Sequence, residues 1–142
     1  MTYDHSSQDG PSETELQIIK SQNKGFLGVA EFENQLPFKT QRIFFFCEVP
    51  EKINRGGHAH HKQQQFIICL SGRVILKTVS ASGKDVFTLD RPSKGVYLPP
   101  MTWTDVCFEE SNSIVIVLTC SNYEEIDYIR DFDTFLSLIN RS

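Results

Sequence analysis

The stretch NRGGHAHHKQQQFIICLSGRV, Asn54 to Val74, places three of the chain's four histidines directly before an apolar run. On an extended strand, residues i and i+2 point to the same side, so His58 and His60 share a face with Cα atoms about 6.6 Å apart. His61 points to the opposite side, where we expect a surface residue. The two glycines at 56–57 leave room beside the pair for a ligand. The stretch therefore predicts a strand with two histidines on one face.

Short apolar runs continue outward from this stretch in both directions, and turn signals separate them. The runs are LQIIKS (16–21), GFLGVAEF (25–32), QRIFFFCEV (41–49), QFIICLSGRVILKTV (65–79), DVFTLDRP (85–92), GVYLPP (95–100), WTDVCFEE (103–110) and SIVIVLTC (113–120). The turn signals are VPEKINRGG (49–57), SGR (71–73), SASGKD (80–85), RPSKG (91–95), LPPM (98–101) and EESNS (109–113). Many short strands without intervening helical patterns predict an antiparallel sandwich or barrel.

The two ends of the chain depart from this pattern. Residues 1–14 are rich in Ser, Asp, Gly and Pro, so we expect a disordered leader there. The tail has apolar residues at steps of three or four, which predicts a short helix: Ile129, Phe132, Leu136 and Ile139. The prediction is a single all-β domain over residues 15–142 that ends in a helix.

Composition and charge narrow the classes of function. A chain of 142 residues suffices for one domain with a core. A net charge of −4 without any basic run argues against a nucleic-acid-binding protein. No apolar run approaches the roughly 18 residues of a membrane span, and the polar, acidic N-terminus is unlike a signal peptide. The cysteines are isolated, which favours buried thiols in a cytoplasmic protein over disulfides or zinc ligands: Cys47, Cys69, Cys107 and Cys120.

Three interpretations of the histidine pair remain open at this point. The pair is a polar strand end with hydrogen-bonded rings, a metal site, or an acid–base pair. A metal site wants three or four good donors, but Gln65 stands five residues after the pair and the only histidine outside this stretch is His5 in the leader. Acid–base work needs no metal, because a histidine with a pKa near 6.5 both takes and gives a proton at neutral pH.

Four stretches in order resemble the nucleotide-sugar 3,4-ketoisomerases, small cupins that act on dTDP-4-keto-6-deoxyglucose. They are LPFKTQRIFFF (36–46), RGGHAHHKQQQFIICLSG (55–72), SKGVYLPPMTW (93–103) and YEEIDYIRDFDTFL (123–136). The resemblance implies a cupin or jelly-roll barrel of two antiparallel sheets. It also implies a metal-free enzyme without a cofactor, which moves the ketone from C4 to C3 for the synthesis of a 3-amino-3,6-dideoxysugar. Family members are typically homodimers whose N-terminal strands cross between subunits.

The resemblance also implies roles for particular residues. His58 and His60 are the expected catalytic pair, which passes protons through an enediol or enediolate. The expected substrate-binding residues are Lys24, Arg42, Arg55, Gln65, Tyr97, Trp103 and Thr104. The arginines suit the pyrophosphate because a guanidinium binds phosphate oxygens bidentately. Four members of this set also have a structural interpretation: Arg42 in an ion pair, Gln65 at a strand edge, and Tyr97 and Trp103 in packing.

The chain departs from the family pattern at three places, and the mildest is His61, which stands where Lys is common. Phe44, Phe45 and Phe46 stand where the family usually has tyrosines, and Thr104 stands where Arg or His is common. The position of Thr104, with the one near Lys24, is associated with the configuration at C4, which therefore stays open. The competing functions are a 3,5-epimerase of the same sugar nucleotides, a non-catalytic sugar-nucleotide-binding domain and a metal-dependent cupin oxygenase.

Overall fold

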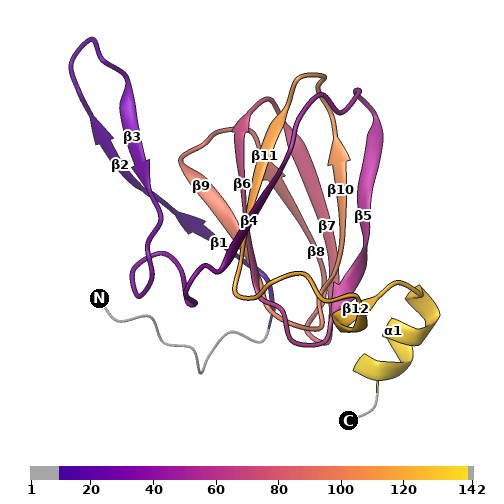
Figure 1. Ribbon diagram of the computed structural model, residues 1–142. Coiled ribbons are helices and arrows are strands. Elements are labelled where there is room, and N and C mark those ends of the chain that lie inside the picture. Colours follow the sequence, from indigo (N-terminus) through magenta and orange to yellow (C-terminus); the bar gives the residue numbers. More distant parts are fainter. Residues whose placement is uncertain (1–9, 141–142) are drawn as a thin grey trace.

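The computed structural model describes residues 10–140, and its strands form two antiparallel sheets that face one another (Figure 1). The first sheet has the order β1 (Ser12–Glu15), β9 (Lys94–Leu98), β6 (Gln65–Ser71), β11 (Ile114–Thr119) and β4 (Arg42–Phe46). The second has the order β12 (Tyr128–Ile129), β5 (Ile53–His60), β10 (Trp103–Phe108), β7 (Val74–Ser80) and β8 (Gly83–Leu89). The fold is completed by a hairpin of β2 (Gln17–Lys20) and β3 (Phe26–Val29), a 3₁₀ turn η2 (Glu125–Asp127) and helix α1 (Phe132–Ile139). The expected all-β sandwich with a C-terminal helix is confirmed.

The main core lies between the two sheets, because alternate residues of each strand point inward. The fully buried members of this core come from both sheets and are Val74, Leu76, Leu89, Val96, Phe108 and Val115. Phe44 and Phe46 of β4 pack against this core and meet edge to face, with ring centroids 5.8 Å apart. Burial of these side chains is the main force that holds the two sheets together.

Two smaller clusters cover the outer faces of the sheets. Leu36 and Phe38, which precede β4, pack on the outside of the first sheet against Phe66 and Tyr97. Helix α1 packs on the outside of the second sheet and buries Phe135 completely. The helix begins after Asp131, whose side chain accepts a hydrogen bond from the backbone N–H of Thr134 at 2.9 Å, as expected of an N-cap.

The expected boundaries are wrong in two places. Strand β1 begins at Ser12 and pairs with β9, so residues 12–14 belong to the sheet and not to the leader; residues 1–9 lie outside the described part of the chain. The stretch expected as a turn at 49–57 contains the first half of β5. That strand continues through Gly56 and Gly57 because both glycines adopt positive φ, 92° and 75°.

Gly56 has a second reason to lack a side chain. A Cβ at this position would lie 2.7 Å from the backbone oxygen of Thr104 in the neighbouring strand β10. The register of β5 against β10 shifts at this point, between Thr104 and Asp105. The irregular stretch thus precedes His58, and it fixes how the last residues of β5 enter the space between the sheets.

The hairpin β2–β3 stands away from the two sheets (Figure 1). Ile19, Phe26 and Leu27 on it are about half exposed or more. Lys24 lies at its turn, where its backbone N–H donates to the backbone oxygen of Ser21 at 3.1 Å. Within residues 10–140, no helix is long and apolar enough to cross a membrane.

Candidate active site

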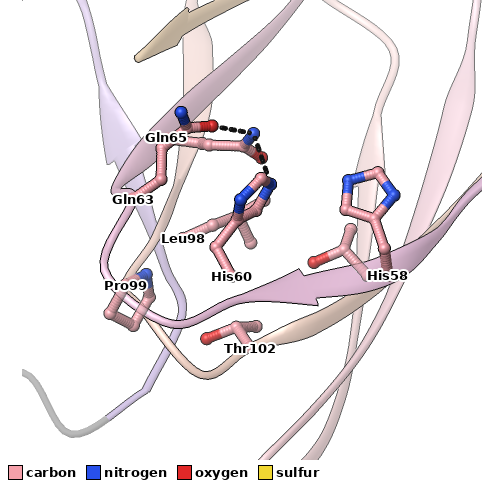
Figure 2. A pocket seen from close by; sticks show the side chains of 8 residues that line it. His58, His60, Gln63, Gln65, Leu98, Pro99 and Thr102 are labelled. Carbon is pink, nitrogen blue, oxygen red and sulfur yellow. Dashed lines mark hydrogen bonds between the residues drawn. The ribbon is translucent and has the colours of Figure 1, made fainter. Parts of the chain in front are cut away.

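One end of the space between the sheets is polar, near the short strand β12. A cavity of about 200 Å³ lies there and is lined by Phe44, Phe46, Arg55, Gly56, His58, Gln65, Ile67, Thr104, Val106, Val117 and Arg130. A much smaller cavity adjoins it, lined by His58, His60, Gln63, Gln65, Leu98, Pro99, Thr102 and Thr104 (Figure 2). His58, Gln65 and Thr104 border both cavities. The side chains that carry acid–base chemistry therefore lie at the inner end of a pocket.

His58 and His60 lie side by side on the inner face of β5, as the alternation of the strand requires. Their ring centroids are 5.2 Å apart and their planes are perpendicular. The ring of Tyr128 from β12 lies against both, with its centroid 4.9 Å from that of His58 and 4.3 Å from that of His60. His61 is exposed on the other side of the chain. Tyr128 thus closes one side of the pair and limits how far either ring can rotate.

Asp127 at the end of η2 binds the inner histidine. Its Oδ2 lies 3.1 Å from Nδ1 of His60. The same carboxylate accepts hydrogen bonds from the backbone N–H groups of Lys62, at 2.8 Å, and Gln63, at 3.2 Å. The two backbone donors hold Asp127 in place, so the carboxylate orients the ring of His60. Asp127 was not among the residues expected from the sequence, where its only signal was its place in the matched stretch 123–136.

A chain of hydrogen bonds determines which nitrogen of His60 carries the proton. Arg42 can only donate, so the atom that its Nη2 meets at 3.3 Å is Oε1 of Gln63. That oxygen also accepts from Nε2 of Gln65 at 3.0 Å, and the same amide nitrogen lies 3.4 Å from Nε2 of His60 (Figure 2). Nε2 of His60 is therefore an acceptor, and Nδ1–H donates to Asp127. The lone pair of Nε2 is thus directed at the amide of Gln65, which borders both cavities.

Both histidines are neutral at neutral pH. Burial and the neighbouring His58 lower the pKa of His60 to about 4, although the hydrogen bond and charge of Asp127 act to raise it. Burial and the charge of Arg130 lower the pKa of His58 as well. Each neutral ring has one nitrogen that accepts a proton and one that donates. The pair can thus serve as base and acid in the same pocket.

Two arginines lie at the wall of the larger cavity. The guanidinium of Arg55 lies over the ring of Phe46, 4.7 Å from its centroid. Arg130 forms two hydrogen bonds to Glu125, at 2.8 and 2.9 Å, and lies 4.3 Å from the ring centroid of Tyr128. This pairing lowers the pKa of Glu125 to about 2. Arg130 was not expected from the sequence, because only the fold brings it beside His58.

Most of the expected site residues meet in this pocket. His58, Gln65, Thr104 and Arg55 line the larger cavity, and His60 lines the smaller one. Arg42 borders neither cavity. It lies behind Gln63, and its guanidinium also lies 5.0 Å from the ring centroid of Phe44 and 5.7 Å from that of Tyr123. Its Nε also donates to Oγ1 of Thr119 at 3.4 Å. Within residues 10–140, its partners are therefore an amide, a hydroxyl and two aromatic rings, and not the acidic residue of an ion pair.

Three expected site residues lie elsewhere in this chain. Trp103 points to the opposite face of β10 from Thr104 and packs under α1, 5.0 Å from the ring centroid of Phe132. Tyr97 points to the outer face of the first sheet, where its hydroxyl donates to Oε1 of Gln64 at 2.7 Å. Lys24 lies on the β2–β3 hairpin. The structure thus supports the packing interpretation of Trp103 and Tyr97, and it corrects their assignment to the pocket.

The donors around the pair suit proton transfer better than metal binding. Within residues 10–140, no three His, Cys, Asp or Glu side chains are grouped to hold a metal ion. The polar residues that line the small cavity are two histidines, two glutamines and two threonines, and the apolar ones are Leu98 and Pro99. Zinc and iron sites instead use thiolate, imidazole and carboxylate ligands together.

Comparison with known proteins gives a consistent result. Residues 10–140 match the family model described as "FdtA: WxcM-like, C-terminal". The chain is 34% identical over 119 residues to a TDP-4-oxo-6-deoxy-alpha-D-glucose-3,4-oxoisomerase of Aneurinibacillus thermoaerophilus, covering 82% of this chain and 84% of the relative.

Solved structures of 3,4-ketoisomerases share the fold. The sugar 3,4-ketoisomerase QdtA of Thermoanaerobacterium thermosaccharolyticum, solved in complex with TDP, superposes with a TM-score of 0.87 at 27% identity, over 93% of this chain and 96% of QdtA. The TDP-fucose-3,4-ketoisomerase WlaRA of Campylobacter jejuni gives a TM-score of 0.85 at 27% identity, over 92% of this chain and 96% of WlaRA. The cupin fold expected from the sequence is confirmed.

Proposed function

We propose that this chain, which belongs to the FdtA/WxcM-like family of sugar-nucleotide 3,4-ketoisomerases, moves the ketone of dTDP-4-keto-6-deoxyglucose from C4 to C3. The observation that carries this proposal is the pair of neutral histidines on one strand face: His58 borders both the cavity of about 200 Å³ and the small cavity beside it, and His60 lines the small one. Such a pair suits the removal of a proton next to a carbonyl and its return to the neighbouring carbon.

We assign the carbon proton to His60 and the oxygen proton to His58. The C4 carbonyl acidifies the C3–H, and Nε2 of His60 takes that proton once its hydrogen bond with the Gln65 amide opens, which leaves an enediolate. His58 then transfers the proton of the C3 hydroxyl to the oxygen on C4. His60 returns its proton to C4, so that the ketone lies at C3 and both rings are neutral again. The hydrogen bond from Nδ1 to Asp127 supports this role because it stabilises the cationic form of His60 during the reaction.

Polar donors near the pair have a second task. General acid–base catalysis contributes about 10²–10⁴ in rate, and the charge on the enediolate oxygens needs stabilisation as well. Gln65 and Thr104 border both cavities and supply an amide and a hydroxyl. Arg55 and Arg130 at the larger cavity suit the pyrophosphate of the substrate, which an acidic protein must bind with local cations.

We also propose that the enzyme is a cytoplasmic homodimer with exchanged N-terminal strands. The apolar faces of the β2–β3 hairpin and of the edge strand β4 support this, since Phe45 is 68% exposed and Ile43 is 57% exposed. In such a dimer the hairpin reaches the partner, which offers Lys24 a place near the partner's pocket. The four free cysteines suit a reducing compartment.

One observation favours a second candidate, a 3,5-epimerase of the same sugar nucleotides. Such enzymes commonly pair His with Asp, and His60 has this partner in Asp127. The two reactions differ in the carbon that exchanges its hydrogen: an epimerase labels C3 and C5 of the substrate, and a ketoisomerase labels C4 of a new 3-keto sugar.

Proton NMR of dTDP-4-keto-6-deoxyglucose with this protein in D₂O containing EDTA tests the proposal. We expect a new 3-keto species with deuterium at C4, and its coupling constants give the configuration there. Deuterium at C5 without a new ketone would establish the epimerase instead. An unchanged substrate whose nucleotide resonances broaden would mean that the protein binds without turnover.

A further inference from the structure

The larger cavity has a second side that the proton transfers do not use. Its polar side carries His58, Gln65 and Thr104, with Arg55 and Arg130 beside them. The remaining side chains that line it are all apolar and are Phe44, Phe46, Ile67, Val106 and Val117. We call these five side chains the apolar wall.

The strand register makes most of the apolar wall continuous. Val117 of β11 pairs with Phe44 of β4 on one side and with Ile67 of β6 on the other. Val106 stands on β10, in the other sheet. All five side chains belong to the main core or pack against it, and the two phenylalanines are only half-buried, so part of each ring remains exposed. No side chain of the wall has a hydrogen-bond donor or acceptor.

The apolar wall begins two residues away from the polar side. Ile67 follows Gln65 on the inner face of β6, and Val106 follows Thr104 in the same way on β10. Two residues of a strand span about 6.6 Å. In a hexose, C6 is two bonds from C4, about 2.5 Å away, and carbon atoms in contact lie about 4 Å apart. If the C3–C4 edge lies at the histidines, the group on C5 is thus long enough to reach the wall.

Among the groups of the proposed substrate, the C6 methyl group suits the apolar wall best. The hydroxyls and the pyrophosphate need hydrogen bonds or cations, which the polar side and the two arginines supply. The thymine is separated from the hexose by the ribose and both phosphates. A methyl group gains from contact with apolar side chains, whereas a hydroxyl in its place loses water and finds no partner there.

We propose that the apolar wall receives the C6 methyl group of the hexose and makes this enzyme selective for sugar nucleotides that lack a hydroxyl at C6. The inference rests on the proposed isomerase function and names the class of sugar that the same site accepts. An apolar pocket rejects an added hydroxyl by up to about 10²-fold, so the selectivity is large enough to measure as a difference in affinity.

Isothermal titration calorimetry with dTDP-6-deoxyglucose and dTDP-glucose tests this selectivity. The two ligands differ by the hydroxyl at C6, and neither carries the ketone, so turnover does not interfere. We expect the wild type to bind dTDP-6-deoxyglucose about 30-fold more tightly than dTDP-glucose, as for one buried hydroxyl without a partner. A titration with dTDP gives the affinity for the nucleotide alone.

Val106→Thr changes the apolar wall, because threonine keeps the shape of valine and adds a hydroxyl. We expect the preference for dTDP-6-deoxyglucose to fall to about threefold, since the new hydroxyl offers a partner to the hydroxyl at C6. Val115→Thr is the matched control: Val115 is fully buried in the same core but lines neither cavity, so the preference keeps its wild-type value. Val117→Thr makes the same change in the wall if Val106→Thr does not fold.

Equal affinity of the wild type for the two sugar nucleotides would overturn the inference. So would a preference in Val106→Thr that matches the one in Val115→Thr. A loss of affinity in Val106→Thr that is equal for dTDP and for both sugar nucleotides would place the nucleotide at the wall and overturn it as well. The proposed function fails separately, if the wild type makes no 3-keto product. A protein that makes none but keeps the preference would retain the apolar wall as a binding site for 6-deoxy sugars.

Discussion

The two ends of the space between the sheets are built from the same strands and have opposite character. In β6, Gln65 at one end is followed by Ile67 on the same inner face. In β10, Thr104 is followed by Val106 and then by Phe108, which is fully buried. In both strands, the end near the histidines carries polar side chains and the other end carries apolar core side chains.

The polar side chains at the histidine end need hydrogen-bond partners, whereas the apolar side chains at the other end need only close packing. Buried polar residues gather at the histidine end and include His60, Gln63, Gln65, Thr78, Thr102, Thr104 and Thr119. A buried polar group is costly unless it is hydrogen-bonded. The series of hydrogen bonds from Arg42 through Gln63, Gln65 and His60 to Asp127 meets this need for these residues and fixes the protonation of His60. Within residues 10–140, the hydroxyls of Thr78, Thr102 and Thr104 have no such partner.

Leu89→Ala breaks the apolar end and has the largest expected effect on stability. Leu89 is fully buried in the main core, and its register partner is Val74, far along the strands from the histidines. We expect a fall of about 3 kcal/mol in the free energy of unfolding, measured by urea denaturation. The kcat of the folded enzyme stays unchanged. Val86→Ala, at a site 67% exposed on the same strand, costs less than about 0.5 kcal/mol. A loss of kcat with Leu89→Ala would contradict the separation of the two ends.

Asp127→Asn tests the polar end through a positioning residue. Asparagine keeps the size of the side chain but loses the charge that favours Nδ1–H on His60. We expect kcat to fall about 10²-fold with little change in KM. The acid limb of the kcat–pH profile moves to lower pH, because Asp127 acts to raise the pKa of His60. An unshifted limb would mean that Asp127 only holds the backbone of residues 62–63.

The polar end also makes a smaller contribution to stability that depends on pH, through His60. The pKa of His60 is about 4 in the folded protein and about 6.5 in an unfolded chain. Between these values the unfolded chain binds more protons, so the free energy of unfolding falls as the pH drops, by roughly 2 kcal/mol from this group at pH 5. Denaturation of wild type and His60→Asn at pH 7 and pH 5 measures it. The free energy of unfolding of His61→Asn should fall between pH 7 and pH 5 as much as that of the wild type, and that of His60→Asn should fall less. An equal fall in His60→Asn would show that His60 is not the group with the lowered pKa.

Much of this arrangement could be predicted from the sequence. The alternation of His58 and His60 on one strand face needs only the period of a β-strand, and the short apolar runs give the sandwich. The resemblance added Arg42, Arg55, Gln65 and Thr104, which the structure places in or directly behind the pocket.

The remainder depends on contacts between distant parts of the chain. Asp127 lies 67 residues from its partner His60, and no local pattern joins them. Trp103 and Tyr97 lie outside the pocket because of the strand face to which they point. Their neighbours Thr104 and Leu98 point inward, so Trp103 and Tyr97 point outward. The turn expected before the histidines became a strand because two glycines at positive φ let β5 pass Thr104.

The most direct test of the central claim compares His60→Asn with His61→Asn in the conversion of dTDP-4-keto-6-deoxyglucose. These neighbours differ in the face to which they point: His60 is 5% exposed and faces the pocket, whereas His61 lies on the surface. We predict that His60→Asn loses about 10³-fold in kcat and still binds the substrate, while His61→Asn keeps the wild-type rate. Turnover by His60→Asn at the wild-type rate would contradict the account.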